Sequence, residues 1–235
     1  MNWFSKKNKH SNTLSQASAH LELISIHIPK TAGTSFRLML KQEYGEAGAV
    51  RLDIVDGNIR LENQTLDSLQ LPPSVRAIHG HMCFKDVQSA FDLSATPLIT
   101  WLRHPVDRVL SNYFYLLDRM HDFIPKENHA VIPRMVRSLE EFVEAEPNQN
   151  RIAKFLDGAT TNDFVFIGVV EHFEADIPRL ADLMNWKNRS IPKVNETKTE
   201  RPKVSETMRA RIAALNARDM EWYAQALSIS KSGKA

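Results

Sequence analysis

The chain has 235 residues, of which 43% are hydrophobic and 25% are charged. These fractions are close to those of ordinary globular proteins, so they exclude a mainly disordered chain and a collagen-like one. Lysine and arginine total 30 and aspartate and glutamate total 28, and the resulting net charge of +2 is too small for a general nucleic-acid coat. Recognition of an anion by this chain must therefore be local.

Cys83 is the only cysteine, which excludes an internal disulfide and suits the reducing cytoplasm. Residues 1–20 are polar, contain no acidic residue and lack the apolar segment of a signal peptide, so we expect a flexible N-terminal arm. A transit peptide is the weaker alternative, because arginine is absent from this arm. No window approaches the roughly 18 apolar residues of a membrane span. We therefore expect a single cytoplasmic domain over residues 21–230.

The first predicted elements are a buried strand and an amphipathic helix. A short apolar run at residues 21–28 is typical of a buried strand, and Pro29 ends it. Beyond Ser35 the apolar residues recur at helical spacing up to Tyr44. Residues 49–74 show no clear pattern.

The rest of the chain continues this alternation of strands and helices. Further strands are expected at residues 75–81, 96–102 and 164–170. Helices are expected from residue 106 onward, at 173–184, at 205–217 and at 219–227, with a short helix capped by Asn148 among them. Residues 119–147 are helical in part and hard to place. This order predicts a layered α/β domain with a mainly parallel sheet.

The turn between the first strand and the first helix has the features of an anion site. Free N–H groups at a helix start suit phosphate, and Gly33 lets the backbone come close to a ligand. Lys30 adds a mobile charge, while Thr34 and Ser35 can cap the helix and donate hydroxyls. The order differs from a Walker A loop, in which the lysine directly follows the last glycine. An N-capped helix beside a solvated Lys30 explains the pattern equally well.

A second candidate phosphate site begins at Arg103, where a strand ends and a helix begins. Ligands of open α/β sheets collect at such strand ends, and a guanidinium can bind phosphate through two parallel hydrogen bonds. Ser111, on the following helix, could donate its hydroxyl to the same group. Arg108 shares a helical face with Ser111. A helix-capping salt bridge for Arg103 and an ion pair for Arg108 are the structural alternatives.

The third motif is His79-Gly80-His81. Residues two apart on a strand face the same way, and Cys83 would join the two histidines if the strand continued. A zinc site, a hydrogen-bonded core pair and acid–base chemistry are all compatible with this pattern. No fourth ligand stands out, so we expect no metal. A histidine can remove the proton of a reacting hydroxyl.

The first two motifs together resemble those of the sulfotransferases that use 3′-phosphoadenosine 5′-phosphosulfate (PAPS). The string His27–Ser35 is especially similar to the branch of heparan sulfate and uronosyl 2-O-sulfotransferases, which carry a similar His-Gly-His segment. The resemblance implies a P-loop-NTPase-like, three-layer fold. In it Arg103 and Ser111 would hold the 3′-phosphate. The 5′-phosphosulfate would be held by the loop residues Lys30, Thr31, Ala32, Gly33, Thr34 and Ser35.

The resemblance also implies catalytic roles. His81 would be the general base, His79 would support the site, and Lys30 would stabilise charge on the departing phosphate. A basic loop at residues 187–203 would close over the nucleotide, although a loop of solvated charges is the alternative. Its candidate contacts are Asn195, Thr197 and Lys198. Golgi members carry an N-terminal membrane anchor that this chain lacks, which implies a soluble member of the bacterial type.

The expected activity is in-line transfer of a sulfuryl group from PAPS to the hydroxyl of an acceptor, a saccharide by resemblance. We expect no metal, no nucleic-acid partner and no transmembrane segment. Two other functions remain compatible with the motifs: a P-loop-like kinase or NTPase, and a non-catalytic nucleotide- or glycan-binding module. The position of Lys30 and the lack of a clear acidic magnesium ligand after a strand argue against the kinase.

Overall fold

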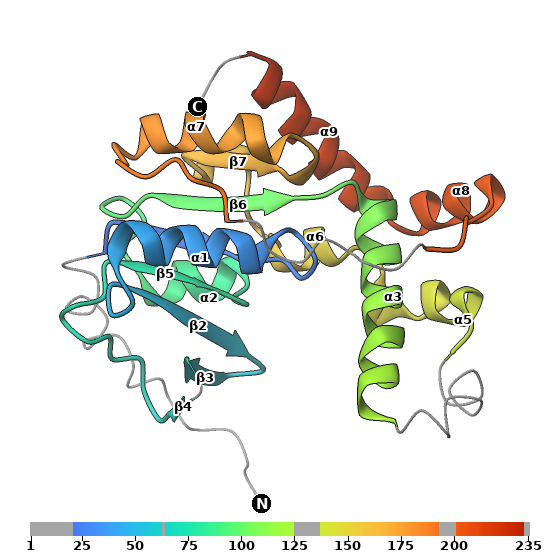
Figure 1. Ribbon diagram of the computed structural model, residues 1–235, viewed down its shortest axis with the longest axis horizontal. Coiled ribbons are helices and arrows are strands. Elements are labelled where there is room, and N and C mark those ends of the chain that lie inside the picture. Colours follow the sequence, from blue (N-terminus) through green and yellow to red (C-terminus); the bar gives the residue numbers. More distant parts are fainter. Residues whose placement is uncertain (1–20, 63, 125–136, 193–200, 233–235) are drawn as a thin grey trace, which may run out of the picture.

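The computed structural model describes residues 21–62, 64–124, 137–192 and 201–232. Within these ranges one sheet has the strand order β4-β3-β2-β5-β1-β6-β7 (Figure 1). Five neighbouring strands are parallel: β2 (Ala49–Val55), β5 (Ala77–Gly80), β1 (Leu23–Ile26), β6 (Leu98–Leu102) and β7 (Phe166–Val169). The antiparallel strands β3 (Asn58–Leu61) and β4 (Gln64–Leu66) extend the sheet beyond β2.

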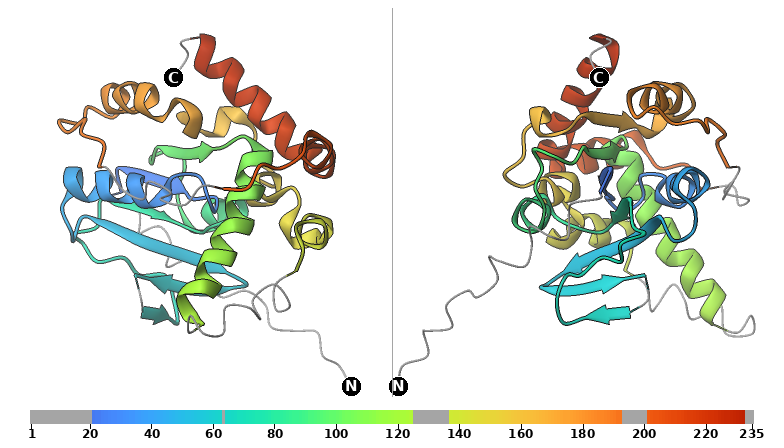
Figure 2. Two further views of the ribbon diagram at one scale, coloured as in Figure 1. Left: turned by 45° about the vertical axis from the view of Figure 1, so that its right-hand side comes forward. Right: turned by 90° about the vertical axis from the view of Figure 1, so that its left-hand side faces the viewer.

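Helices cover both faces of this sheet, and two views in Figure 2 show the resulting three layers. One face packs against α1 (Gly33–Tyr44) and α7 (Phe173–Leu183). The other face packs against α2 (Phe84–Ala90), α6 (Arg151–Phe155) and α9 (Ala217–Ser232). A separate apolar cluster joins α3 (Pro105–Phe123), α5 (Leu139–Glu144) and α8 (Glu206–Leu215), which lie to one side of the sheet in Figure 1. This architecture confirms the predicted α/β class with a mainly parallel sheet.

The sheet carries a helical layer on each face because its side chains alternate between the two faces along each strand. Leu23 and Ile99 face the helices of one layer, whereas Ile24 and Leu98 face those of the other. All four side chains are buried, as the strands of a parallel sheet covered on both faces require.

The structure corrects several details of the sequence analysis. Three strands, β2, β3 and β4, lie between Ala49 and Leu66, where the pattern predicted no element. The strand β5 ends at Gly80, so Cys83 does not continue it and instead caps α2. The cap of α6 is Asn150 rather than Asn148, which donates its side-chain amide to the carbonyl of Phe142. The predicted arm, residues 1–20, lies outside the described residues.

The parallel strands direct three loops to one edge of the sheet. β1 lies between β5 and β6, so the segments that follow the three strands emerge side by side. These segments begin at His27, His81 and Arg103, and they hold the first two motifs and the last residue of the third, whose His79 and Gly80 end β5. Among the helices of the described ranges, none combines the length and the apolar character that crossing a bilayer requires.

Candidate active site

The loop after β1 is a tight turn that leads directly into α1. Lys30 and Ala32 have positive φ angles of 75° and 59°, and the hydroxyl of Thr31 donates to the carbonyl of Ile28 at 2.8 Å. Ala32 occupies the cap position of α1 without a side-chain hydrogen bond. The expectation that Thr34 and Ser35 cap the helix was therefore wrong. Both lie in the first helical turn, beyond the cap.

Gly33 is required by a close contact with His27. A Cβ atom at Gly33 would lie 2.2 Å from two atoms of the His27 imidazole, far inside any real contact distance. The small residue thus lets the loop backbone lie against this ring. The glycine of the first motif has a packing role in addition to the close approach to a ligand that the sequence suggested.

Cations from three separate segments gather beside this loop. Burial lowers the pKa of Lys30, and the positive charges of Arg103 and Arg201 lower it further. The Nζ atom of Lys30 lies 3.8 Å from the ring centroid of Tyr115, on α3. Among the described residues, neither Lys30 nor Arg103 forms an ion pair. The two groups are therefore available to bind an external anion.

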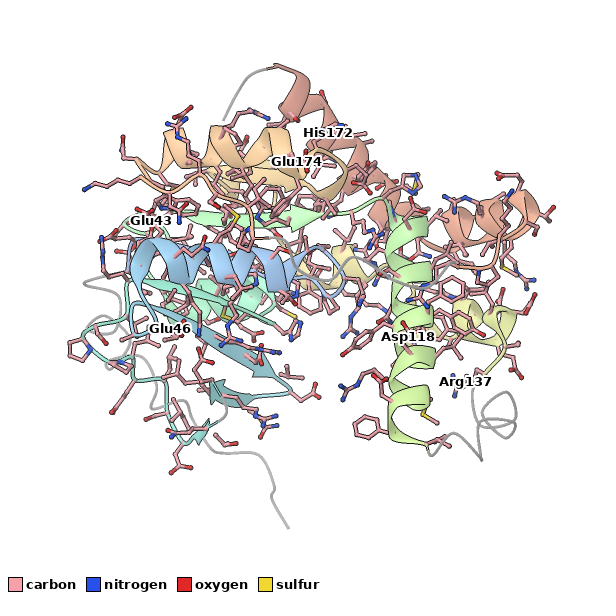
Figure 3. The ribbon with its side chains drawn as sticks, in the orientation of Figure 1. Glu43, Glu46, Asp118, Arg137, His172 and Glu174 are labelled. Atoms are coloured by element: carbon pink, nitrogen blue, oxygen red, sulfur yellow. The ribbon has the colours of Figure 1, made fainter. Side chains whose placement is uncertain are left out.

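Arg103 and Ser111 both line a cavity of about 560 Å³. Its rim also carries Arg201 and Lys203, from the segment before α8. Arg201 is oriented by Asp118, which projects from α3 (Figure 3) and accepts two hydrogen bonds at 3.0 and 2.5 Å. The predicted contacts Asn195, Thr197 and Lys198 lie outside the described residues.

Arg108 is not a solvent-facing member of this site. Its side chain is buried, with 2% of its surface exposed, and it donates to the carbonyl of Asn148 at 3.2 Å. Burial lowers its pKa to about 10, and the nearby carboxylate of Asp219 opposes that shift. The surface ion pair considered for Arg108 is therefore replaced by a buried link between α3 and the segment before α6.

Three histidine rings form a cluster at the ends of β1 and β5. The centroid of His27 lies 4.8 Å from that of His79 and 4.9 Å from that of His81. His79 is buried, and its Nδ1 atom lies 3.0 Å from the hydroxyl of Ser25. Burial lowers its pKa to about 3, and burial together with the two neighbouring imidazoles lowers the pKa of His27 well below 6.5. Both rings are therefore neutral at physiological pH.

His81 differs from the other two rings in its exposure and its partners. It follows β5, and 27% of its side-chain surface is exposed. Its Nδ1 atom lies 3.3 Å from Oδ1 of Asp53 and 3.0 Å from a terminal nitrogen of Arg51. Both partners come from β2. Both contacts involve Nδ1, and among the described residues none forms a hydrogen bond with Nε2 of His81.

Four contributors to this site were absent from the predicted set. His27 stood in the first motif without a role, and Arg201 stood in a basic loop whose charges looked solvated. Arg51 and Asp53 lie on a strand that the pattern did not reveal. Their alternation with apolar residues, Val50, Leu52 and Ile54, is the signal that could have found that strand.

No group of three or more histidine, cysteine, aspartate or glutamate residues in the described ranges could hold a metal ion. In particular, the zinc site considered for His79, His81 and Cys83 does not form, because Cys83 caps a helix that leads away from the strand.

The chain is similar to two sulfotransferases of known structure. Mouse sulfotransferase SULT7A1, solved in complex with PAP, is similar to this chain with 12% identity and a TM-score of 0.48 over 87% of this chain and 66% of the mouse protein. A sulfotransferase from Alicyclobacillus acidocaldarius shows 13% identity and a TM-score of 0.48 over 86% of this chain and 93% of that protein. No curated protein matches the chain. The model of the sulfotransferase family matches residues 16–226, which is most of the sequence. This chain therefore belongs to the sulfotransferase family.

Proposed function

We propose that this protein transfers a sulfuryl group from PAPS to the hydroxyl of an acceptor. The observation that carries the proposal is the cluster of Lys30, Arg103 and Arg201, whose charges oppose one another beside a histidine cluster. Asp118 offsets part of this positive charge by pairing with Arg201, and a ligand with phosphate groups at two positions would neutralise the charges of Lys30 and Arg103. The family membership supports the same donor.

The loop and the cavity divide the recognition of this donor between them. Lys30 and the N–H groups from Thr31 to Ser35 are suited to the 5′-phosphosulfate, because they surround the start of α1. Arg103 and Ser111 face one cavity and are suited to the 3′-phosphate. We also propose that Asn195, Thr197 and Lys198 close over the nucleotide, next along the chain to Arg201.

His81 is the general base of the proposed reaction. The acceptor oxygen forms a bond to sulfur while the bond between sulfur and the bridging phosphate oxygen breaks, and the acceptor proton passes to Nε2 of His81. Lys30 stabilises the negative charge that grows on the leaving phosphate. His79 is too deeply buried to reach an acceptor and supports the site by packing against His27.

The acceptor is proposed to be a saccharide. The support is the resemblance of the string His27–Ser35 and of the His-Gly-His segment to the carbohydrate branch of the family. The assignment to the uronosyl 2-O branch stays a prediction. Mass spectrometry of candidate saccharides after incubation with PAPS tests it, because transfer adds one sulfo group to the acceptor.

Calorimetry tests the donor. Adenosine 3′,5′-bisphosphate should bind more tightly than ATP, because Arg103 and Ser111 are assigned to a 3′-phosphate that ATP lacks. Equal or tighter binding of ATP, together with a magnesium requirement, would support the kinase alternative and remove the proposal.

Transfer of labelled sulfate tests the base. His81→Asn should abolish turnover while the bisphosphate still binds, and the same substitution at the exposed His172 should leave turnover unchanged. Normal turnover in His81→Asn would reassign the base. Absence of transfer by the wild-type protein to every acceptor tried, with tight nucleotide binding, would favour a binding module.

A further inference from the structure

We propose that Asp53 is a positioning residue that selects the tautomer of His81 with the proton on Nδ1. In this tautomer the Nε2 atom carries a lone pair and can accept a proton. The inference rests on the proposed function, because it takes His81 as the base. Its starting point is that one carboxylate oxygen, Oδ1 of Asp53, lies 2.7 Å from the backbone nitrogen of His81 and 3.3 Å from its Nδ1 atom.

The backbone around His81 is built for this contact. The N–H of Ile54, next to Asp53 on β2, donates to the carbonyl of His81 at 2.9 Å. At Gly80 a Cβ atom would lie 1.8 Å from the carbonyl oxygen of Leu52 and 3.0 Å from Oδ1 of Asp53. Only glycine at position 80 therefore allows β2 to lie this close to the end of β5. The glycine between the two histidines serves the contact with Asp53.

Arg51 competes for the same ring nitrogen. One of its terminal nitrogens lies 3.0 Å from Nδ1 of His81, and a guanidinium only donates hydrogen bonds. When Arg51 donates to Nδ1, the ring proton sits on Nε2 and the ring cannot accept another there. When Nδ1 donates to Asp53, Nε2 is free. The two neighbours thus favour opposite tautomers, and only the one favoured by Asp53 is a base.

The remaining neighbours do not decide the tautomer. His27 stacks on His81 with its ring centroid 4.9 Å away, and Phe155 lies edge-on at 6.4 Å. Arg51 also donates from Nε to Oδ2 of Asp53 at 2.8 Å, which fixes the carboxylate in place. Burial alone would raise the pKa of Asp53, but hydrogen bonds from His81 and the charge of Arg51 bring it well below its usual range. The carboxylate is therefore ionised whenever the enzyme works.

Asp53→Asn provides the test, because asparagine keeps the size of the side chain and an oxygen for the backbone N–H of His81. The amide is neutral, so its oxygen accepts the Nδ1 proton more weakly than the carboxylate does. Its nitrogen, in place of Oδ2, cannot accept from Nε of Arg51, so the guanidinium competes more strongly for Nδ1. We expect kcat to fall by roughly 10²–10⁴, the contribution of a positioned general base, with KM and bisphosphate affinity within about threefold. Glu62→Gln is the matched control. Glu62 accepts from the backbone of Arg51 at 2.8 Å, makes no contact with His81, and its variant should keep kcat.

A second readout is the ¹⁵N spectrum of the imidazole rings in the presence of the bisphosphate, with His81 assigned by comparison with His81→Asn. We expect the proton on Nδ1 in the wild-type protein and on Nε2 in Asp53→Asn. A wild-type ring with its proton on Nε2 overturns the inference even if the variant fails to fold.

Activity separates this inference from the proposed function. If His81→Asn loses turnover while Asp53→Asn keeps kcat within threefold, the inference alone is wrong. If His81→Asn keeps turnover, the assignment of the base is wrong and the inference falls with it. If Asp53→Asn lowers kcat with an unchanged KM, and the ring proton of His81 moves from Nδ1 to Nε2, the inference is supported.

Discussion

Replacing Arg103 by alanine separates recognition of the 3′-phosphate from recognition of the rest of the nucleotide. Arg103 forms no ion pair among the described residues, so its removal leaves none of their carboxylates without a partner. The repulsion that it exerts on Lys30 also disappears. We therefore expect the free energy of unfolding to stay unchanged or to rise slightly. The loss should appear in ligand binding alone.

The size of that loss follows from the two hydrogen bonds that a guanidinium can make to one phosphate. Hydrogen bonds to charged groups contribute about 1.5–3 kcal/mol each, and the lower value applies because Arg103 is partly exposed. Two such bonds give about 3 kcal/mol, or a loss of about 100-fold in affinity. Adenosine 5′-phosphate, which has no 3′-phosphate, should lose less than about threefold.

Calorimetry of both nucleotides with the wild-type protein and the variant measures this difference. Arg76→Ala is the matched control, because it removes the same charge from a surface pair with Glu22. It should leave both affinities unchanged. The assignment of Arg103 is refuted if the bisphosphate binds the variant as tightly as the wild type, or if both nucleotides weaken equally.

Three further substitutions test the loop and the histidine cluster. Gly33→Ala places a methyl group against His27 and should lower stability by about 1–3 kcal/mol in thermal unfolding, together with turnover; an unchanged melting temperature would contradict the contact. Lys30→Met should lower kcat by roughly 10²-fold in the labelled-sulfate assay, and a change in KM alone would remove its role at the leaving group. Burial lowers the pKa of His79 from 6.5 to about 3, so acid protonates the unfolded ring first and stability falls as pH drops below 6.5. In urea unfolding, His79 should account for a loss of about 2 kcal/mol in the free energy of unfolding between pH 7 and pH 5, and His79→Asn should lack this contribution. If the wild type and the variant lose the same free energy of unfolding over this range, His79 is not a neutral buried ring.

The three motifs were readable from the sequence because each lies at the end of an apolar strand or directly after it. β1, β5 and β6 are short, buried on both faces and bounded by turns, so their ends could be placed and their loops brought to one edge. Parallel order then put Lys30 and Arg103 close together, as the resemblance implied. The strand ends needed only local pattern, whereas the assignment of both loops to one nucleotide came from the resemblance.

β2 was missed, although its charged and apolar residues alternate as in a half-buried strand. It is half-buried and continues into two antiparallel strands, and its charged residues, Arg51 and Asp53, look like those of a surface loop. Their partner, His81, is about thirty residues away, and the pairing of β2 with β5 fixes the contact. Register between distant strands is a tertiary property, so nothing local could assign Asp53 to the histidine.

The helix α2 was missed for a different reason. It has seven residues, begins at Phe84 and is capped by Cys83, which is not one of the usual capping residues. A short helix with such a start looks like the continuation of the preceding strand. That misreading placed the cysteine beside the histidines and suggested a metal ligand that the fold sends elsewhere.

The imidazole of His27 contacts both the loop after β1 and the proposed base, His81. The ring lies against the backbone of Gly33, in the loop proposed to bind the donor, and it stacks on His81, the proposed base. A substitution that shifts this one ring would therefore disturb both the donor loop and the proton acceptor.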